Sequence, residues 1–157
     1  MRFSPSVFVP APSGANAPAA LNRGILDDDL LAPATFPALK DKLRDALARR
    51  EPYHIVHFDG HGVYDKVHGL GGLVFEHPDD AREGKLHGRN HEVITADRLG
   101  AELRNAGVGL FFLEACQSAR SDERPDASVA GKLWQSGIAS VAAMSHSVLV
   151  ETAKRFT

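Results

Sequence analysis

Residues 53–64 read Y-H-I-V-H-F-D-G-H-G-V-Y, an apolar run followed by a histidine between two glycines. The run over 55–58 has the length and the β-branched content of a buried strand. We expect this strand to break at Asp59-Gly60 and to present His61 just beyond its end. Because open α/β sheets place their sites at the carboxyl ends of their strands, His61 is a candidate functional residue.

A second apolar run, over 109–115, ends in the same way on Cys116, the only cysteine of the chain. If the two strands are parallel and adjacent, they bring an imidazole and a thiol to one rim of the sheet. An imidazole that accepts the thiol proton makes cysteine a nucleophile, and the backbone N–H groups of Gly62 and Cys116 would then face the same carbonyl oxygen. Taken alone, a cysteine after an apolar strand is more often a small buried residue.

The flanking sequence alternates helices and strands. Thr35 and Ser128 are expected N-caps, Thr95 is expected to open another helix, and Gly107 and Gly137 are expected helix ends. This order predicts a three-layer α/β/α domain with a mostly parallel sheet and helices on both faces. Further expectations are a strand over 73–75, polar loops over 76–92 and 118–126, a strand over 138–144, and a last helix over 148–156.

Composition separates two parts of the chain. Residues 1–34 are rich in Pro, Ala, Ser and Gly, which predicts a linker or a loosely held N-terminal arm. Residues 35–157 form the expected domain. Its last helix has no C-cap, so we expect the C-terminal end of the domain to be truncated.

The chain has 157 residues, 43% apolar and 24% charged, which is typical of one globular domain. A formal net charge of -2 predicts no binding to nucleic acid or to anionic membranes. A single cysteine forms no internal disulfide, which favours a reducing, cytoplasmic setting. The histidines follow no zinc-binding pattern, so we expect neither a metal nor another cofactor.

Two acidic residues, Asp59 and Glu114, fall near the expected rim. One interpretation is that they are solvated or bonded to nearby backbone. The other is that one of them lines a substrate pocket and favours Arg or Lys at the P1 position.

The blocks His57-Phe-Asp-Gly-His-Gly62 and Leu113-Glu-Ala-Cys-Gln-Ser-Ala119 resemble the two signature blocks of the CHAT domain family. That family contains caspase-like cysteine peptidases, related to caspases and separases and commonly attached to tetratricopeptide repeats in bacteria. The resemblance implies a caspase-haemoglobinase fold with His61 as general base and Cys116 as nucleophile. It also implies an oxyanion site made by the backbone of Gly62 and Cys116. Caspases carry Gln-Ala-Cys where this chain has Glu114-Ala-Cys, which argues against a preference for acidic P1 residues.

The expected function is therefore hydrolysis of peptide bonds in a protein substrate by a cysteine endopeptidase with a Cys116–His61 dyad. The expected partners are that substrate and, in addition, repeat segments flanking the domain. An alternative is a catalytically silent caspase-like module that binds signalling partners. A second alternative is another cysteine hydrolase, such as a thioesterase or an amidase.

Overall fold

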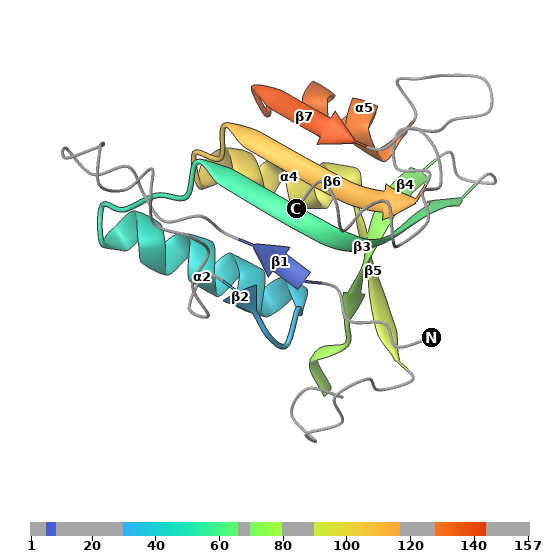
Figure 1. Ribbon diagram of the computed structural model, residues 1–157, viewed down its shortest axis with the longest axis horizontal. Coiled ribbons are helices and arrows are strands. Elements are labelled where there is room, and N and C mark those ends of the chain that lie inside the picture. The colour runs from blue at the N-terminus through green and yellow to red at the C-terminus, as the bar shows by residue number, and fades with distance from the viewer. Residues whose placement is uncertain (1–5, 9–29, 66–69, 80–89, 117–127, 144–157) are drawn as a thin grey trace, which may run out of the picture.

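The computed structural model describes residues 6–8, 30–65, 70–79, 90–116 and 128–143 (Figure 1). The expected loop over 118–126 and the expected helix over 148–156 lie outside these residues. In chain order the elements are β1 (Ser6–Phe8), β2 (Leu30–Leu31), α2 (Phe36–Ala48), β3 (Ile55–Asp65), β4 (Leu70–Glu76), β5 (His91–Thr95), α4 (Ala96–Asn105), β6 (Leu110–Cys116), α5 (Val129–Gln135) and β7 (Ser140–Ala143).

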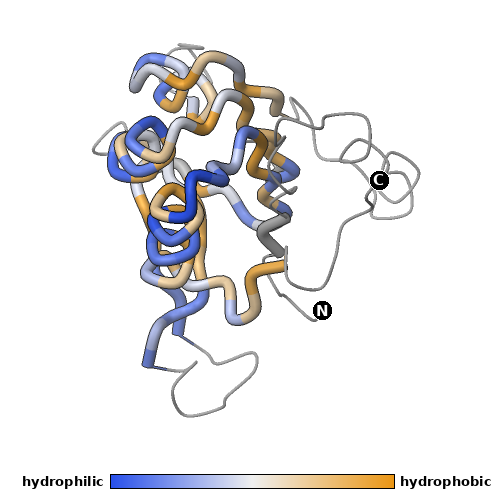
Figure 2. The backbone as a smooth tube through the Cα atoms, turned by 90° about the vertical axis from the view of Figure 1, so that its left-hand side faces the viewer, coloured by the Kyte–Doolittle hydropathy of each residue, from blue (hydrophilic) through white to orange (hydrophobic). Residues whose placement is uncertain are grey.

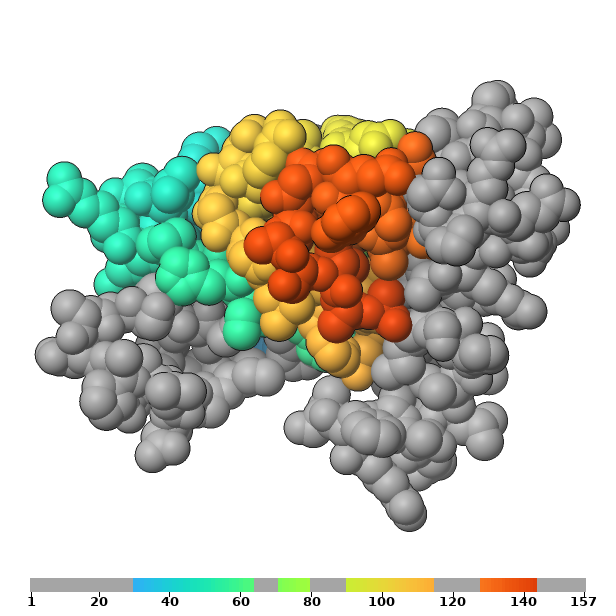
Figure 3. Space-filling model, turned by 90° about the horizontal axis from the view of Figure 1, so that it is seen from above, coloured from blue at the N-terminus to red at the C-terminus, as the bar shows by residue number. Residues whose placement is uncertain are grey.

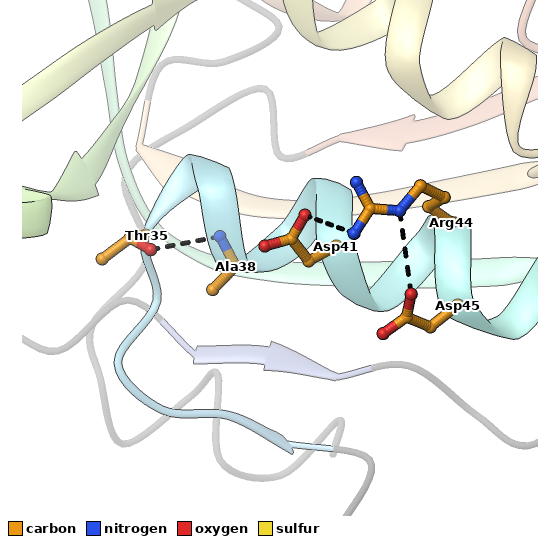
Figure 4. A network of polar contacts seen from close by, with 5 residues as sticks. All are labelled: Thr35, Ala38, Asp41, Arg44 and Asp45. Carbon is orange, nitrogen blue, oxygen red and sulfur yellow. Dashed lines mark hydrogen bonds and ion pairs between the residues drawn. The ribbon is translucent and has the colours of Figure 1, made fainter.

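Two helices begin at the predicted N-caps. The Thr35 hydroxyl accepts a hydrogen bond from the Ala38 amide at 3.3 Å (Figure 4). The Ser128 hydroxyl accepts one from the Gly131 amide at 3.0 Å. Each bond satisfies an amide that has no partner within its helix. Further along α2, Arg44 pairs with Asp41 on the exposed side of the helix (Figure 4).

The strands form one seven-stranded mixed sheet. The part formed by β3, β6 and β7 is parallel as predicted, since β6 pairs in parallel with β3 and with β7. The four other pairings are antiparallel and join β1 to β2, β1 to β3, β3 to β4, and β4 to β5. The α/β class is thus confirmed, whereas the expectation of a mostly parallel sheet holds only for β3, β6 and β7. β3 and β4 are separated by only four residues in the sequence, which is too few for the crossover that a parallel pairing requires, so these two strands are antiparallel.

The sequence prediction missed three strands. β1 and β2 lie within the segment whose composition indicates a linker, and the assignment of that segment as an arm stays a prediction. β5 was expected as part of a polar loop, because it is short and carries no continuous apolar run. Its pairing with β4 is close: a Cβ on Gly72 would lie 2.8 Å from the carbonyl oxygen of Ile94.

β3 does not break at Asp59-Gly60 as expected but continues to Asp65. β1 pairs with β3 up to Asp59, and β4 pairs with it from His61 onward. Because β6 occupies the opposite edge of β3 as far as His61, β1 and β4 follow each other along the same edge. The glycines around His61 are therefore held extended by pairing with new neighbours, which the local sequence does not reveal.

The two faces of the sheet differ. On one face, side chains such as Phe58 and Phe75 are buried with the apolar stripe of α2 and with α4 and α5. On the opposite face, which we call the open face, Ile55 is 40% exposed and Phe112 is 36% exposed. Figures 1 and 2 show α2, α4 and α5 on one side of the sheet only. The expectation of helices on both faces is therefore not met within the described part of the chain.

β7 is an edge strand of the described sheet, and its residues and those of α5 face the viewer together in Figure 3. In the part of the chain that the structure describes, no helix combines the length and the apolar character needed to cross a membrane.

Candidate active site

The candidate site lies where β6 ends beside β3. The two strands run parallel and in register from the pair Ile55–Leu110 to the pair His61–Cys116. His61 and Cys116 are therefore direct partners on neighbouring strands and form the last pair of this ladder. The side chain of Cys116 lies outside the described residues, so this placement rests on the backbone register.

His61 is exposed on the open face of the sheet. On its other edge, β3 pairs with β4, and His61 lies opposite Val74. Partial burial of the ring lowers the pKa of His61 below its usual value of 6.5, while the nearby Asp59 carboxylate acts in the opposite direction. At neutral pH the imidazole is therefore mostly in its neutral form, which accepts protons.

Gly62, the expected contributor of an oxyanion amide, pairs with Leu73 of β4. Among the described strands, β6 reaches only as far along β3 as His61. Gly62 follows His61 on β3, and Cys116 is the partner of His61 on β6. The backbones of Gly62 and Cys116 are therefore diagonal neighbours at the point where the parallel ladder ends.

The two carboxylates that the sequence places near the rim are also register partners. Asp59 lies opposite Glu114, one step of the same face before the His61–Cys116 pair. Asp59 is exposed, whereas the side chain of Glu114 is only 8% exposed. Glu114 is therefore largely shielded from solvent, whereas Asp59 is accessible to it.

His57 is a neighbour of the site that sequence reasoning did not assign to it. Its Nε2 atom lies 3.5 Å from Oε2 of Glu114, and its side chain is 14% exposed. Its ring also packs edge-on against Phe112, with 5.0 Å between the ring centroids. The signal was available, because residues two and four apart on a strand lie on the same face.

Among the described residues, no three His, Cys, Asp or Glu side chains are grouped closely enough to hold a metal ion. The described side chains at the site include the acid–base groups His57, Asp59, His61 and Glu114. Such a set supports nucleophilic and proton-transfer chemistry at a carbonyl carbon.

An α/β sheet that carries a histidine and a cysteine in register on neighbouring parallel strands is compatible with a caspase-like fold. The model of the CHAT domain family matches residues 3–157, so the chain belongs to the CHAT domain family, which is related to caspase-like peptidases. A search of curated proteins found no match, and a search of solved structures found none either.

Proposed function

We propose that this protein is a cysteine endopeptidase that cleaves a protein substrate through a Cys116–His61 dyad. The observation that supports this most strongly is the register pairing of the two residues at the end of the parallel ladder between β3 and β6. Register partners on adjacent strands are about 5 Å apart at the backbone, which is within the reach of a thiol and an imidazole. Family membership supports the same reaction class.

In the proposed reaction, His61 accepts the thiol proton and the Cys116 thiolate attacks the scissile carbonyl carbon. The backbone N–H groups of Gly62 and Cys116 donate hydrogen bonds to the resulting oxyanion. His61 then gives its proton to the leaving amine, which breaks the C–N bond and leaves a thioester. Water, deprotonated by His61, hydrolyses the thioester and restores the free thiol.

The lowered pKa of His61 supports its role as the base. A free cysteine thiol has a pKa of about 8.5, so only a small fraction is thiolate at neutral pH without help. An imidazole with a pKa below 6.5 is mostly neutral at pH 7 and is available to take the thiol proton. Protonated His61 cannot accept the thiol proton, so we expect activity to fall as the pH drops below the pKa of His61.

We also propose that Asp59 and Glu114 give the site a preference for substrates with Arg or Lys at P1. Both residues lie on the strands that carry the dyad, two register pairs away from it and on the same face of the sheet. A partly desolvated carboxylate binds a cationic side chain more strongly than a neutral one. Similar kcat/KM values for peptides with neutral and with basic P1 residues would contradict this preference.

The test is covalent labelling with an irreversible thiol-directed peptide probe, combined with cleavage of a P1-diverse peptide library. We expect labelling at Cys116, loss of labelling and cleavage in Cys116→Ala, and strong loss in His61→Ala. The matched control is His54→Ala, which removes an exposed histidine just before the same strand. Labelling that is unaffected by His61→Ala would refute the dyad.

The competing function is a catalytically silent module that binds partners. The open face favours it, since Ile55, Val63 and Phe112 are exposed there side by side with the site. A module of this kind would show no cleavage of any library member and no dependence of probe labelling on His61. Ester substrates in the same panel distinguish a thioesterase or an amidase from a peptidase.

A free thiolate is needed for the proposed reaction, which supports a reducing compartment such as the cytoplasm. The proposed partners are the protein substrate and flanking tetratricopeptide repeats. The low net charge of the chain gives no support to nucleic acid or membrane binding.

A further inference from the structure

Next to the dyad, on the side away from Cys116, the open face of the sheet carries apolar side chains. His61 pairs with Val74 of β4, and Val74 in turn pairs with Val93 of β5. Because paired residues on neighbouring strands point to the same face of a sheet, the two valines lie in one row with His61. Val63 lies two residues after His61 on β3 and therefore on the same face. We call Val63, Val74 and Val93 the valine strip.

The valine strip is open to solvent. Val63 is 37% exposed and Val93 is 47% exposed, and Val74 is partly buried. Gly72 pairs with Val63 and puts no side chain between the valines. A Cβ on Gly72 would lie 2.9 Å from Cγ1 of Val93, so the Val93 side chain already reaches over the glycine. An exposed apolar surface beside reacting groups is suited to a ligand that covers it.

The order of the strands decides which part of a substrate meets the valine strip. β6, which carries Cys116, lies on one side of His61, whereas β4 and then β5 lie on the other side. In the proposed reaction the scissile carbonyl carbon bonds to the sulfur of Cys116, and the leaving amine takes its proton from His61. The leaving amine therefore lies on the His61 side of the scissile bond, which is the side of the valine strip.

We propose that the valine strip binds apolar side chains on the leaving-group side of the substrate, at positions P1′ to P3′. This inference rests on the proposed peptidase function and adds a second part to its specificity. Neighbouring strands are about 4.8 Å apart, so β5 lies about 10 Å beyond β3. An extended peptide advances about 3.3 Å per residue, so this distance corresponds to about three substrate residues. Substrates with Val, Ile or Leu at these positions should be preferred over substrates with Ser or Asp.

Two peptides that are identical up to P1 provide the test. One carries valine and the other serine at each of the positions P1′, P2′ and P3′. The ratio of their kcat/KM values cancels any effect on the dyad itself, because such an effect acts on both peptides. We expect a ratio of about ten in favour of the valine peptide, the lower end of the discrimination that apolar contacts supply, because the strip is open to solvent. A ratio near one, with both peptides cleaved, would overturn the inference and leave the peptidase proposal standing.

Val93→Thr keeps the shape of the side chain and replaces one methyl group by a hydroxyl. We expect this variant to lower the ratio about threefold, and Val63→Thr to act in the same direction. The matched control is Ile55→Thr, a comparable change at an exposed position of the same face, six residues and about 20 Å before His61 on β3. This control should keep the wild-type ratio. An unchanged ratio in both valine variants, or an equal fall in Ile55→Thr, would contradict the assignment.

A binding measurement separates this inference from the peptidase proposal. The same two peptides, carrying a fluorophore, can be titrated into Cys116→Ala and followed by fluorescence anisotropy, with folding of each variant checked by circular dichroism. We expect the valine peptide to bind about tenfold more tightly, and Val93→Thr in this background to reduce the difference, even if the wild-type protein cleaves neither peptide. Equal binding of the two peptides would refute the subsite. A dimer in sedimentation velocity that Val93→Thr disrupts would show that the strip joins two copies of the chain, which would also overturn the assignment to substrate.

Discussion

Replacement of Gly100 by alanine tests how closely α4 and α5 pack behind the sheet. Gly100 is buried in the middle of α4, and Ser136 caps the end of α5. A Cβ on Gly100 would overlap the Ser136 hydroxyl and would lie 2.7 Å from the Ser136 Cβ. The hydroxyl, which donates a hydrogen bond to the Leu133 carbonyl at 2.6 Å, can rotate away. The Ser136 Cβ has no such freedom, so α5 has to shift.

Two opposing effects decide the magnitude. Alanine is favoured over glycine in a helix interior by about 1 kcal/mol. An added methyl group in a tightly packed site costs about 1–3 kcal/mol, and an overlap with an immovable Cβ belongs to the upper half of that range. We therefore expect Gly100→Ala to lower the free energy of unfolding by about 1–2 kcal/mol. For a domain of this size this corresponds to a fall in Tm of about 2–8 °C.

The assay is urea unfolding followed by circular dichroism, with thermal melts as a second measure. The control is the same change in the Ser136→Gly background, where both overlapping atoms are absent. There, Gly100→Ala should be neutral or stabilise the protein by up to about 1 kcal/mol through helix propensity. A stabilising effect of Gly100→Ala in the wild-type background would show that the two helices do not meet as described.

Three further predictions follow from individual contacts. Asp59→Asn removes a carboxylate that raises the pKa of His61. The acidic limb of the kcat/KM profile for a neutral peptide should therefore move to lower pH, and a move to higher pH would contradict this. Thr35→Ala removes the hydrogen bond to the Ala38 amide and should cost about 1 kcal/mol in urea unfolding, whereas Thr35→Ser should cost less. Gly107→Ala should lower the free energy of unfolding by about 1–2 kcal/mol, because φ is +76° at this position. No atom lies within 4 Å of the added Cβ, so the cost comes from the backbone conformation alone. A neutral effect would argue against the left-handed conformation.

Local sequence signals predicted the helices and the central strands. Thr35 and Ser128 cap the N-termini of α2 and α5, and Gly107 and Gly137 adopt a positive φ just after the C-caps of α4 and α5. These signals are reliable because capping and left-handed glycines depend on hydrogen bonds and sterics within a few residues. The apolar runs before His61 and Cys116 likewise predicted two strands, and the structure pairs them in parallel.

Pairing between distant strands was beyond such signals. The local pattern at Asp59-Gly60 indicates a strand end, but β4 continues the pairing along the same edge of β3. β1, β2 and β5 are short, and their place in the sheet depends on partners that lie elsewhere in the chain. Strand propensity is a weak guide for such segments, because it reflects packing against neighbours more than a preference of the backbone.

The candidate site shows the same division. The chemistry of its residues and their positions near strand ends were readable from the chain, and they led to His61, Cys116 and the two nearby acids. The contact of His57 with Glu114, and the burial of that carboxylate, required the register of β3 against β6. Residue types define which protons and charges are available, whereas the register between distant strands defines which of them meet and how far water is excluded.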